Sequence, residues 1–167
     1  MPPMPRVPAD WRFVCGHPAH FIAFGFGSGL APVAPGTFGS LVGIPLTLWL
    51  LPAYGDLGFG LILAGAFLIG VWACDVTGKR LGVTDYGGLV WDEVVAMMLI
   101  LWFVPLRPWW ILGAFLLFRL FDIIKLPPAR QIDAHWKSGL GVMLDDIAAA
   151  VHTLIALAVL KRILLAA

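Results

Sequence analysis

The chain has 167 residues, of which 60% are hydrophobic and 13% are charged, and its mean hydropathy is +0.92. A soluble domain carries about 25% charged residues, so the composition excludes an ordinary soluble protein and predicts one membrane domain. The net charge of +1 and the scattered Lys and Arg residues exclude a nucleic-acid backbone as a partner.

Five long apolar runs follow one another along the chain, and we expect all of them to be helical. None alternates with the period of two that a barrel strand requires, and open strand edges are not tolerated in lipid. Several runs are shorter than the roughly 20 residues of a simple membrane span. The sequence therefore predicts an all-α, polytopic membrane helical bundle with four to five apolar helices, some of them re-entrant. The runs are residues 38–51, 57–73, 94–106, 109–124 and 147–160.

The basic residues are shared unevenly between the connections, which predicts an orientation. If all five runs cross the membrane, Arg107, Lys161 and Arg162 lie on one side and a larger group lies on the other. The connection 52–56 has no basic residue, which agrees with an outside location. The Lys161 and Arg162 pair fits less well and favours a last helix that returns or lies shallow. We expect the larger group to be cytoplasmic: Arg6, Arg12, Lys79, Arg80, Lys125, Arg130 and Lys137.

Most of the acidic residues lie on the same predicted side, at the ends of apolar runs or between them. Only Asp56 falls in an outside connection. Simple solvation of helix ends would distribute acids on both sides, and acidic side chains are costly to bury in a membrane. The one-sided distribution therefore predicts a shared site. The acids on this side are Asp75, Asp85, Asp92, Glu93, Asp122, Asp133, Asp145 and Asp146.

The first candidate motif is GFGSGLAPVAPGTFGS, residues 25–40, which is rich in Gly and Pro. Thr37 is placed to cap a helix that begins at Phe38, and Ser28, Thr37 and Ser40 offer hydroxyl groups. Gly-rich backbone ahead of a helix N-terminus binds phosphate because its amide groups converge there. A plain membrane-entry loop explains the segment equally well.

The segment CDVTGKR, Cys74 to Arg80, matches the C-x5-R spacing of cysteine-dependent phosphatases. That chemistry requires a strand, loop and helix arrangement in which loop amides surround the thiolate. Cys74 instead ends an apolar helix. We therefore disfavour this interpretation and expect both cysteines to be reduced packing residues.

In DYGGLVWDEVV, residues 85–95, three carboxylates precede an apolar run. The glycine pair predicts a loop that folds Asp85 back towards Asp92 and Glu93 at the helix entrance. The attraction of acids to the positive end of a helix dipole explains one or two of them. Three carboxylates suit a hard cation such as Mg2+, which takes protein carboxylates together with substrate phosphate.

In FRLFDIIKLPPARQID, residues 118–133, Arg119, Asp122 and Lys125 share one helical face at three-residue spacing. An intrahelical ion-pair ladder at the membrane surface is the alternative. Because Arg119 lies among apolar neighbours and Asp122 alone does not satisfy two cations, we expect a bound phosphate, with Arg130 nearby.

The segment GLGVMLDDIAAAV, residues 139–151, predicts a glycine-rich turn followed by the last helix. Asp145 stands at or near the N-cap of this helix. Capping explains only one of two adjacent acids, so Asp145 and Asp146 are both candidate metal ligands.

Four motifs together resemble the phosphatidylglycerophosphatase A family of bacterial membrane lipid phosphatases. They are GFGSGLAPVAPGTFGSL, VTDYGGLVWDEVV, FRLFDIIKLPPARQID and GLGVMLDDIAA, in the family's order and spacing, between His17 and Leu160. The resemblance implies one membrane-embedded phosphatase domain, which we expect to span residues 1–167, and we expect residues 1–16, which precede the resemblance, to be a flexible or interfacial segment. It implies a multi-pass protein of the bacterial inner membrane with a cytoplasmic active site. The implied reaction is Mg2+-dependent removal of the terminal phosphate from phosphatidylglycerophosphate in the inner leaflet.

The candidate residues take three roles in this reaction. The catalytic group is Asp85, Asp92, Glu93, Asp122 and Asp146, the metal ligands are Asp85, Asp92, Glu93, Asp145 and Asp146, and the substrate contacts Ser28, Thr37, Arg119, Lys125 and Arg130. For the nucleophile we favour metal-activated water over an aspartyl-phosphate intermediate. A small divalent-cation transporter or another membrane phosphomonoesterase is the alternative. The D-G-x2-A-R pattern of membrane alcohol phosphotransferases is absent from the sequence.

Overall fold

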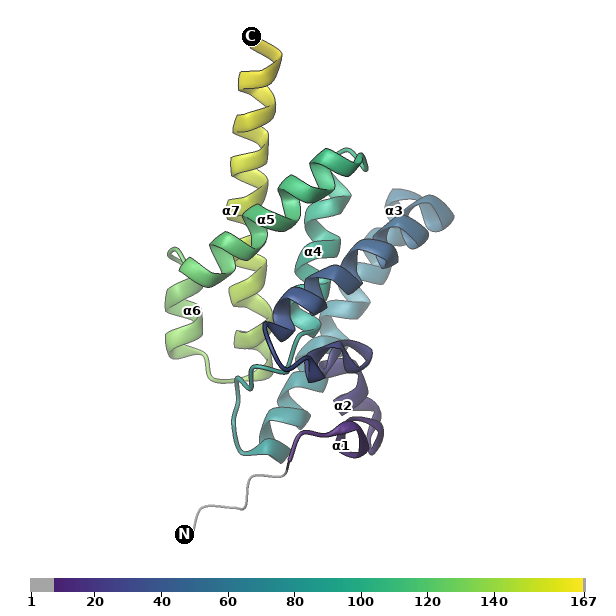
Figure 1. Cartoon of the computed structure of the whole chain (residues 1–167), viewed down its shortest axis with the longest axis vertical. Coiled ribbons are helices and arrows are strands. Elements are labelled where there is room, and N and C mark those ends of the chain that lie inside the picture. Colours follow the sequence, from purple (N-terminus) through teal and green to yellow (C-terminus); the bar gives the residue numbers. More distant parts are fainter. Residues whose placement is uncertain (1–7, 167) are drawn as a thin grey trace.

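The computed structural model describes residues 8–166, and the regular elements in this part of the chain are all helical (Figure 1). The predicted all-α class is therefore confirmed for the described residues. The elements are α1 (Trp11–Cys15), α2 (Pro18–Ala23), the 3-10 helix η1 (Gly25–Leu30), α3 (Pro35–Leu81), α4 (Trp91–Phe103), α5 (Pro108–Ile124), α6 (Ala129–His135) and α7 (Gly139–Ala166). The five predicted runs fall in α3, α4, α5 and α7, although α4 ends at Phe103 and not at residue 106.

Of the N-terminal segment 1–16, residues 1–7 lie outside the described residues. In the remainder, the Asp10 side chain caps α1 by accepting a hydrogen bond from the Phe13 amide at 2.8 Å. Val14 of this short helix is buried. Residues 8–16 are thus a folded part of the domain that packs on α2.

The long element α3 is a helical hairpin of 47 residues. Gly55 interrupts it with φ 65° and ψ −179°, a conformation that is essentially restricted to glycine. The chain reverses direction there, so that residues 35–54 and 56–81 run in opposite senses (Figure 1). The reversal falls in the predicted connection 52–56.

Two helices, α3 and α7, are long and apolar enough to cross a membrane, judged by the length and composition of the described residues. This supports a membrane protein. The helices α4 and α5 have 13 and 17 residues. At about 1.5 Å per residue, α4 covers about 20 Å of a hydrocarbon core that is about 30 Å thick.

The central helix is α4, which packs on α3, α5 and α7. Most of its apolar side chains are buried, with Phe103 at its end exposed, as expected for a central helix of almost uniform hydrophobicity. Gly39 and Gly43 of α3 approach it so closely that a Cβ atom on them would lie 2.8 and 2.7 Å from the carbonyl oxygens of Val90 and Val94. Small residues thus bring α3 against the start of α4, where two candidate carboxylates lie.

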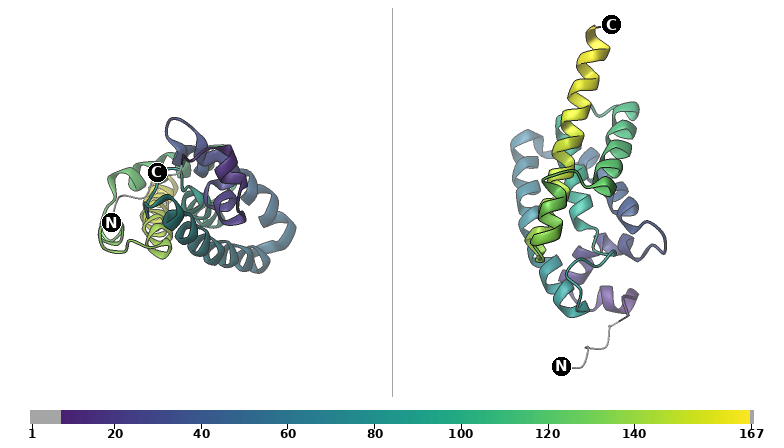
Figure 2. Two further views of the ribbon diagram at one scale, coloured as in Figure 1. Left: turned by 90° about the horizontal axis from the view of Figure 1, so that it is seen from below. Right: turned by 90° about the vertical axis from the view of Figure 1, so that its left-hand side faces the viewer.

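The C-terminal part of α7 extends beyond the other helices, whereas its N-terminal part lies inside the bundle (Figure 2). Asp145 and Asp146 belong to this N-terminal part, and both are buried. α7 as a whole contacts α3, α4, α5 and α6, and its candidate metal ligands lie in the part that is inside the bundle.

Candidate active site

Three acidic side chains meet where α4 begins, and we call them the carboxylate cluster. Asp92 and Glu93 lie in the first turn of α4, and Asp146 lies in the second turn of α7. One carboxylate oxygen of each lies within 4.8 Å of the other two. Asp92 and Asp146 are only 7% and 3% exposed, so the cluster lies in the protein interior.

Each member of the carboxylate cluster has one buried oxygen with no hydrogen-bond partner among the described residues. These atoms are Asp92 Oδ1, Glu93 Oε2 and Asp146 Oδ2. Burying a charged oxygen without a partner is energetically costly. The cluster therefore has the ligand type, the spacing and the spare coordination that suit a hard divalent cation.

The start of α4 is held in place by contacts with α2 and with the glycine-rich η1. The Val90 amide donates a hydrogen bond to the Ala23 carbonyl of α2 at 2.8 Å. Gly29 of η1 lies so close to the loop before α4 that a Cβ atom on it would be 2.0 Å from the Gly88 carbonyl oxygen. This backbone contact leaves no room for a side chain on Gly29, and it fixes the position at which the two carboxylates of α4 enter the cluster.

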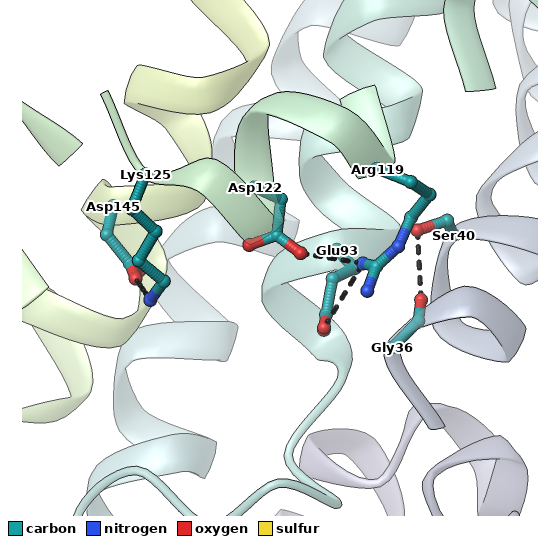
Figure 3. Close-up of polar contacts among 7 residues, drawn as sticks. All are labelled: Gly36, Ser40, Glu93, Arg119, Asp122, Lys125 and Asp145. Atoms are coloured by element: carbon teal, nitrogen blue, oxygen red, sulfur yellow. Dashed lines mark hydrogen bonds and ion pairs between the residues drawn. The ribbon is translucent and has the colours of Figure 1, made fainter. Parts of the chain in front are cut away.

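Arg119 of α5 reaches the carboxylate cluster through Glu93 (Figure 3). Its Nη1 atom lies 2.9 Å from Asp122 Oδ2 and 3.6 Å from Glu93 Oε1. All three side chains are largely buried, so solvent screens these interactions less than it would at the surface. The guanidinium is thus a positioned cation beside the cluster, and guanidinium groups bind phosphate oxygens well.

Gly36 is a site residue that the sequence analysis does not single out. A Cβ atom there would lie 2.1 Å from Glu93 Oε1 and 3.0 Å from both terminal nitrogens of Arg119. Figure 3 shows the Gly36 backbone beside this ion pair. The density of Gly and Pro in residues 25–40 indicates that the backbone approaches something closely. Only the packing of α3 against α4 and α5 identifies what it approaches.

Lys125 is directed away from the face that it is predicted to share with Arg119. α5 ends at Ile124, and Lys125 is its C-cap residue with φ 49°, so it has left the helical conformation. Its Nζ atom donates to Asp145 Oδ2 at 2.6 Å and joins α5 to α7 (Figure 3). The predicted face is therefore wrong for Lys125 and holds for the pair of Arg119 and Asp122.

The predicted N-cap position of Asp145 is also wrong, because α7 begins at Gly139 and contains Asp145 in its second turn. Adjacent residues of a helix point about 100° apart, so they meet different partners. Asp145 meets Lys125, and Asp146 joins the carboxylate cluster.

Three predicted site residues are not among the side chains that form the carboxylate cluster or the ion pairs of Arg119. Asp85 is exposed in the loop between α3 and α4, and its oxygens do not belong to the group within 4.8 Å. Arg130 is exposed on α6. Ser28 donates its hydroxyl to the Gly25 carbonyl at 2.8 Å, a contact within η1. Asp85 lies in a loop whose folding the sequence does not reveal, whereas Arg130 belongs to α6 and Ser28 to η1.

The predicted N-cap role of Thr37 is wrong as well. α3 begins at Pro35, and its N-cap residue is Ala34, with φ 49°. Thr37 lies within the first turn and donates its amide to the Ala34 carbonyl at 2.9 Å. Ser40 donates its hydroxyl to the Gly36 carbonyl at 2.9 Å. The hydroxyl of Ser40 is thus used within α3, and it is the backbone at Gly36 that approaches the ion pair.

Cys74 is fully buried in the second arm of α3, which stays helical to Leu81. The segment 74–80 therefore does not form the loop that a cysteine-dependent phosphatase requires. Both cysteines are free. Cys74 is the packing residue that we expect, whereas Cys15 is exposed.

The fold and the site define a class, namely all-helical membrane proteins that gather acidic and basic side chains in a buried polar site. Within this class the chain belongs to the phosphatidylglycerophosphatase A family, whose model matches residues 21–161. The chain is 45% identical over 140 residues to phosphatidylglycerophosphatase A of Haemophilus influenzae, and this match covers 83% of this chain and 86% of the relative. It is 40% identical over 145 residues to phosphatidylglycerophosphatase A of Escherichia coli, and this match covers 86% of this chain and 83% of the relative.

A Bacteroides thetaiotaomicron protein with the provisional name of a phosphatidylinositol-3-phosphatase is 36% identical over 150 residues. That match covers 86% of this chain and 93% of the relative. No solved structure matches the chain. The family match confirms the resemblance carried by the four motifs, and its range contains every candidate site residue.

Proposed function

We propose that the chain is a membrane lipid phosphatase that hydrolyses phosphatidylglycerophosphate to phosphatidylglycerol and phosphate. The observation that carries this proposal is family membership over residues 21–161, with 40% and 45% identity to two relatives named phosphatidylglycerophosphatase A. The carboxylate cluster and Arg119 supply the charges that phosphoryl transfer uses, which are ligands for a metal ion and a cation for the phosphate.

We infer that Mg2+ is the cofactor and that Asp92, Glu93 and Asp146 hold it. Support comes from the proximity of their oxygens and from the buried oxygens that have no hydrogen-bond partner among the described residues. Mg2+ usually takes one or two protein carboxylates together with waters and substrate phosphate. When bound, it would neutralise charge on the phosphoryl group and make water a better nucleophile.

The protein's own groups would orient the substrate. Arg119 presents paired N–H donors to phosphate oxygens, and Glu93 and Asp122 hold its guanidinium in place. The first turn of α3 approaches the same point at Gly36, where helix N-terminal amides favour an anion. One carboxylate of the cluster accepts the proton of the attacking water.

We further propose that the protein is a multi-pass protein of the bacterial inner membrane, with four to five apolar helices in the bilayer and a cytoplasmic site. The excess of Lys and Arg in the connections on the predicted inner side supports this orientation. The phosphomonoester of the substrate lies at the level of the lipid headgroups. A site at the start of α4 would meet it there, while the acyl chains stay in the bilayer.

The test is phosphate release from phosphatidylglycerophosphate in mixed micelles by the purified protein, with and without a chelator. We expect activity to disappear on chelation and to return with Mg2+. Asp92→Asn and Asp146→Asn should each lower kcat/KM by about 100-fold or more, because a lost metal ligand costs several kcal/mol of transition-state stabilisation. Asp75→Asn is the matched control, since Asp75 is a solvent-accessible acid paired with Lys79 and should be dispensable.

Circular dichroism and melting temperatures of the variants separate a loss of chemistry from a loss of fold. Full activity in both Asn variants would remove these residues from the metal site. Faster hydrolysis of phosphatidylinositol 3-phosphate than of phosphatidylglycerophosphate would overturn the proposed substrate. Transport of Mg2+ into vesicles without phosphate release would support a transporter instead.

A further inference from the structure

A second cavity lies between the N-terminal helices and the end of α3. It has a volume of about 690 Å³ and is lined by basic and aromatic side chains, with no acidic residue in its lining. We call it the basic cavity. The side chains that matter here are Phe13, His17, His20, Lys79 and Arg80. None of the residues of the carboxylate cluster lines it, so it is a separate feature of the molecule.

Of the two cationic side chains that line the basic cavity, Arg80 is the one that can pair with a bound anion. Lys79 is engaged in an ion pair with Asp75 in the preceding turn. Arg80 has no carboxylate within ion-pair distance among the described residues, although Asp75 is only five positions away in the sequence. A guanidinium at the wall of a cavity, with its donors unused, is suited to an oxyanion with several acceptor oxygens.

The two histidines of the basic cavity are fixed in orientation. His17 Nδ1 accepts a hydrogen bond from the Ala19 amide at 3.1 Å, so a neutral His17 carries its proton on Nε2. His20 Nδ1 lies 2.9 Å from Thr77 Oγ1, and the Phe13 ring stacks on the imidazole at 4.3 Å. Two positioned imidazoles thus add hydrogen-bonding groups beside Arg80.

His20 contributes hydrogen bonding rather than charge at neutral pH. Burial lowers the pKa of His20 below its usual 6.5, and the nearby His17 and Arg80 lower it further. Its neutral ring leaves Arg80 as the main unpaired charge. One cation with neutral donors around it matches a phosphate ester better than it matches a metal ion or a neutral sugar.

An exposed aromatic side chain, Trp72, lies beside the basic cavity, and a second, Trp11, is exposed on α1. Trp72 lies with its ring 6.2 Å from that of His17 and is 46% exposed, and Trp11 is 56% exposed. Tryptophan is enriched where a protein crosses the membrane–water interface. In a bilayer, an exposed Trp72 at the interface would place the basic cavity at the depth at which lipid phosphates are found.

We propose that the basic cavity is a second phosphate-binding site, which takes the phosphate of an anionic phospholipid headgroup or a free phosphate ion. The cavity is large enough for a headgroup and opens beside residues suited to the lipid interface. Arg80 binds the phosphate oxygens, and His17 and His20 complete the hydrogen bonding. This site does not depend on the reaction that the carboxylate cluster performs, and its occupancy is measured without turnover.

The test is binding of inorganic phosphate and of phosphatidylglycerol, read from the ring signals of isotope-labelled histidine in detergent-solubilised protein. Single His→Gln variants assign the signals of His17 and His20, and His135 and His152 serve as internal references. We expect the His17 and His20 signals to shift on titration. Arg80→Gln should weaken the apparent affinity by about tenfold, the loss expected for a charge-assisted hydrogen bond. Arg12→Gln, an exposed cation outside the cavity lining, should bind as the wild type does.

The two ligands distinguish the sources of the phosphate. Shifts with inorganic phosphate in lipid-free micelles support a site for the free ion, and shifts with phosphatidylglycerol alone support a headgroup site. Equal affinities of Arg80→Gln and Arg12→Gln, or histidine signals that stay fixed with both ligands, would overturn the proposal. Equal shifts with phosphatidylcholine, which carries no net charge, would overturn it too. Loss of phosphatase activity in the same samples bears only on the function proposed above.

Discussion

The carboxylate cluster places three like-charged residues together in the interior, with Arg119 as the neighbouring cation. Repulsion between carboxylates and their removal from water both oppose such an arrangement. Residues that break the rules of stable packing in this way are expected at functional sites, where the arrangement serves a ligand. The cluster is therefore the part of the molecule where small changes in geometry should affect activity more than stability.

Gly36→Ala tests this at one residue. The added Cβ atom would lie 2.1 Å from Glu93 Oε1, and the flexible carboxylate would have to move while the helices stay in place. We expect kcat/KM for phosphatidylglycerophosphate to fall by about 10- to 100-fold, since a misplacement of about 1 Å has effects of this size. The melting temperature should change little.

Gly65→Ala is the matched control for Gly36→Ala. Gly65 also lies in α3, and a Cβ atom on it would meet nothing within 4 Å. Its replacement should leave activity unchanged. Wild-type activity in Gly36→Ala would show that the carboxylate of Glu93 does not need its present position.

At the level of elements, two features determine how the helices meet. The hairpin of α3 turns at Gly55, and the bond between Lys125 and Asp145 joins the end of α5 to α7. The first depends on a backbone conformation and the second on an ion pair. Both position the helices that carry the carboxylate cluster and Arg119.

Gly55→Ala should destabilise the hairpin through the backbone alone. Gly55 has φ 65° and ψ −179°, and a Cβ atom on it would have no neighbour within 4 Å, so steric clash with other residues plays no part. Strain in this region costs about 1 to 3 kcal/mol. We expect the melting temperature to fall by about 2 to 4 °C per kcal/mol in thermal unfolding experiments. Gly65→Ala, within the second arm, should keep or raise it, and an unchanged Gly55→Ala protein would contradict the strained turn.

The helices could be predicted because an apolar run and its breaks are local properties of the sequence. The turn at residues 52–56 is such a break. The apolar run did not predict that Asp145 lies inside a helix. α7 begins at Gly139, well before its apolar run starts at residue 147. Hydrophobicity marks the part of a helix that is buried in lipid or core, and not the polar turns that precede it.

The candidate site was partly predictable for a related reason. Asp92, Glu93 and Asp146 could be chosen because acids at the ends of apolar runs are unusual. Asp85 was chosen by the same criterion, yet the loop that carries it is held by the contact of Gly29 with Gly88. Contacts between distant segments decide where a loop residue points, and a single sequence does not contain them. Gly36 was missed because a glycine has no side chain to indicate its partner.

Considered as a whole, the molecule has two unlike ends. The start of α4 and the helices α1, α2 and α6 lie towards one end, whereas the turn of α3 and the C-terminal part of α7 lie towards the other (Figure 1). The carboxylate cluster is at the start of α4, and the basic cavity is lined by residues of α1, α2 and the end of α3. This polarity matches the one-sided distribution of charge in the sequence. A protein with such an asymmetry should adopt one orientation in the membrane, with its basic end inside.

Cysteine labelling of intact cells tests this orientation at two exposed alanines, Ala53 beside the turn of α3 and Ala134 on α6. The background is Cys15→Ser, because Cys15 is exposed, while buried Cys74 remains. With a membrane-impermeant maleimide, Ala53→Cys should react before lysis. Ala134→Cys should react only after lysis, because the proposed orientation, with the excess of Lys and Arg inside, puts α6 in the cytoplasm. Retained activity of both variants shows that labelling reports the native fold. The reverse labelling pattern, or labelling of both positions from outside, would put the carboxylate cluster on the wrong side of the membrane for a substrate in the inner leaflet.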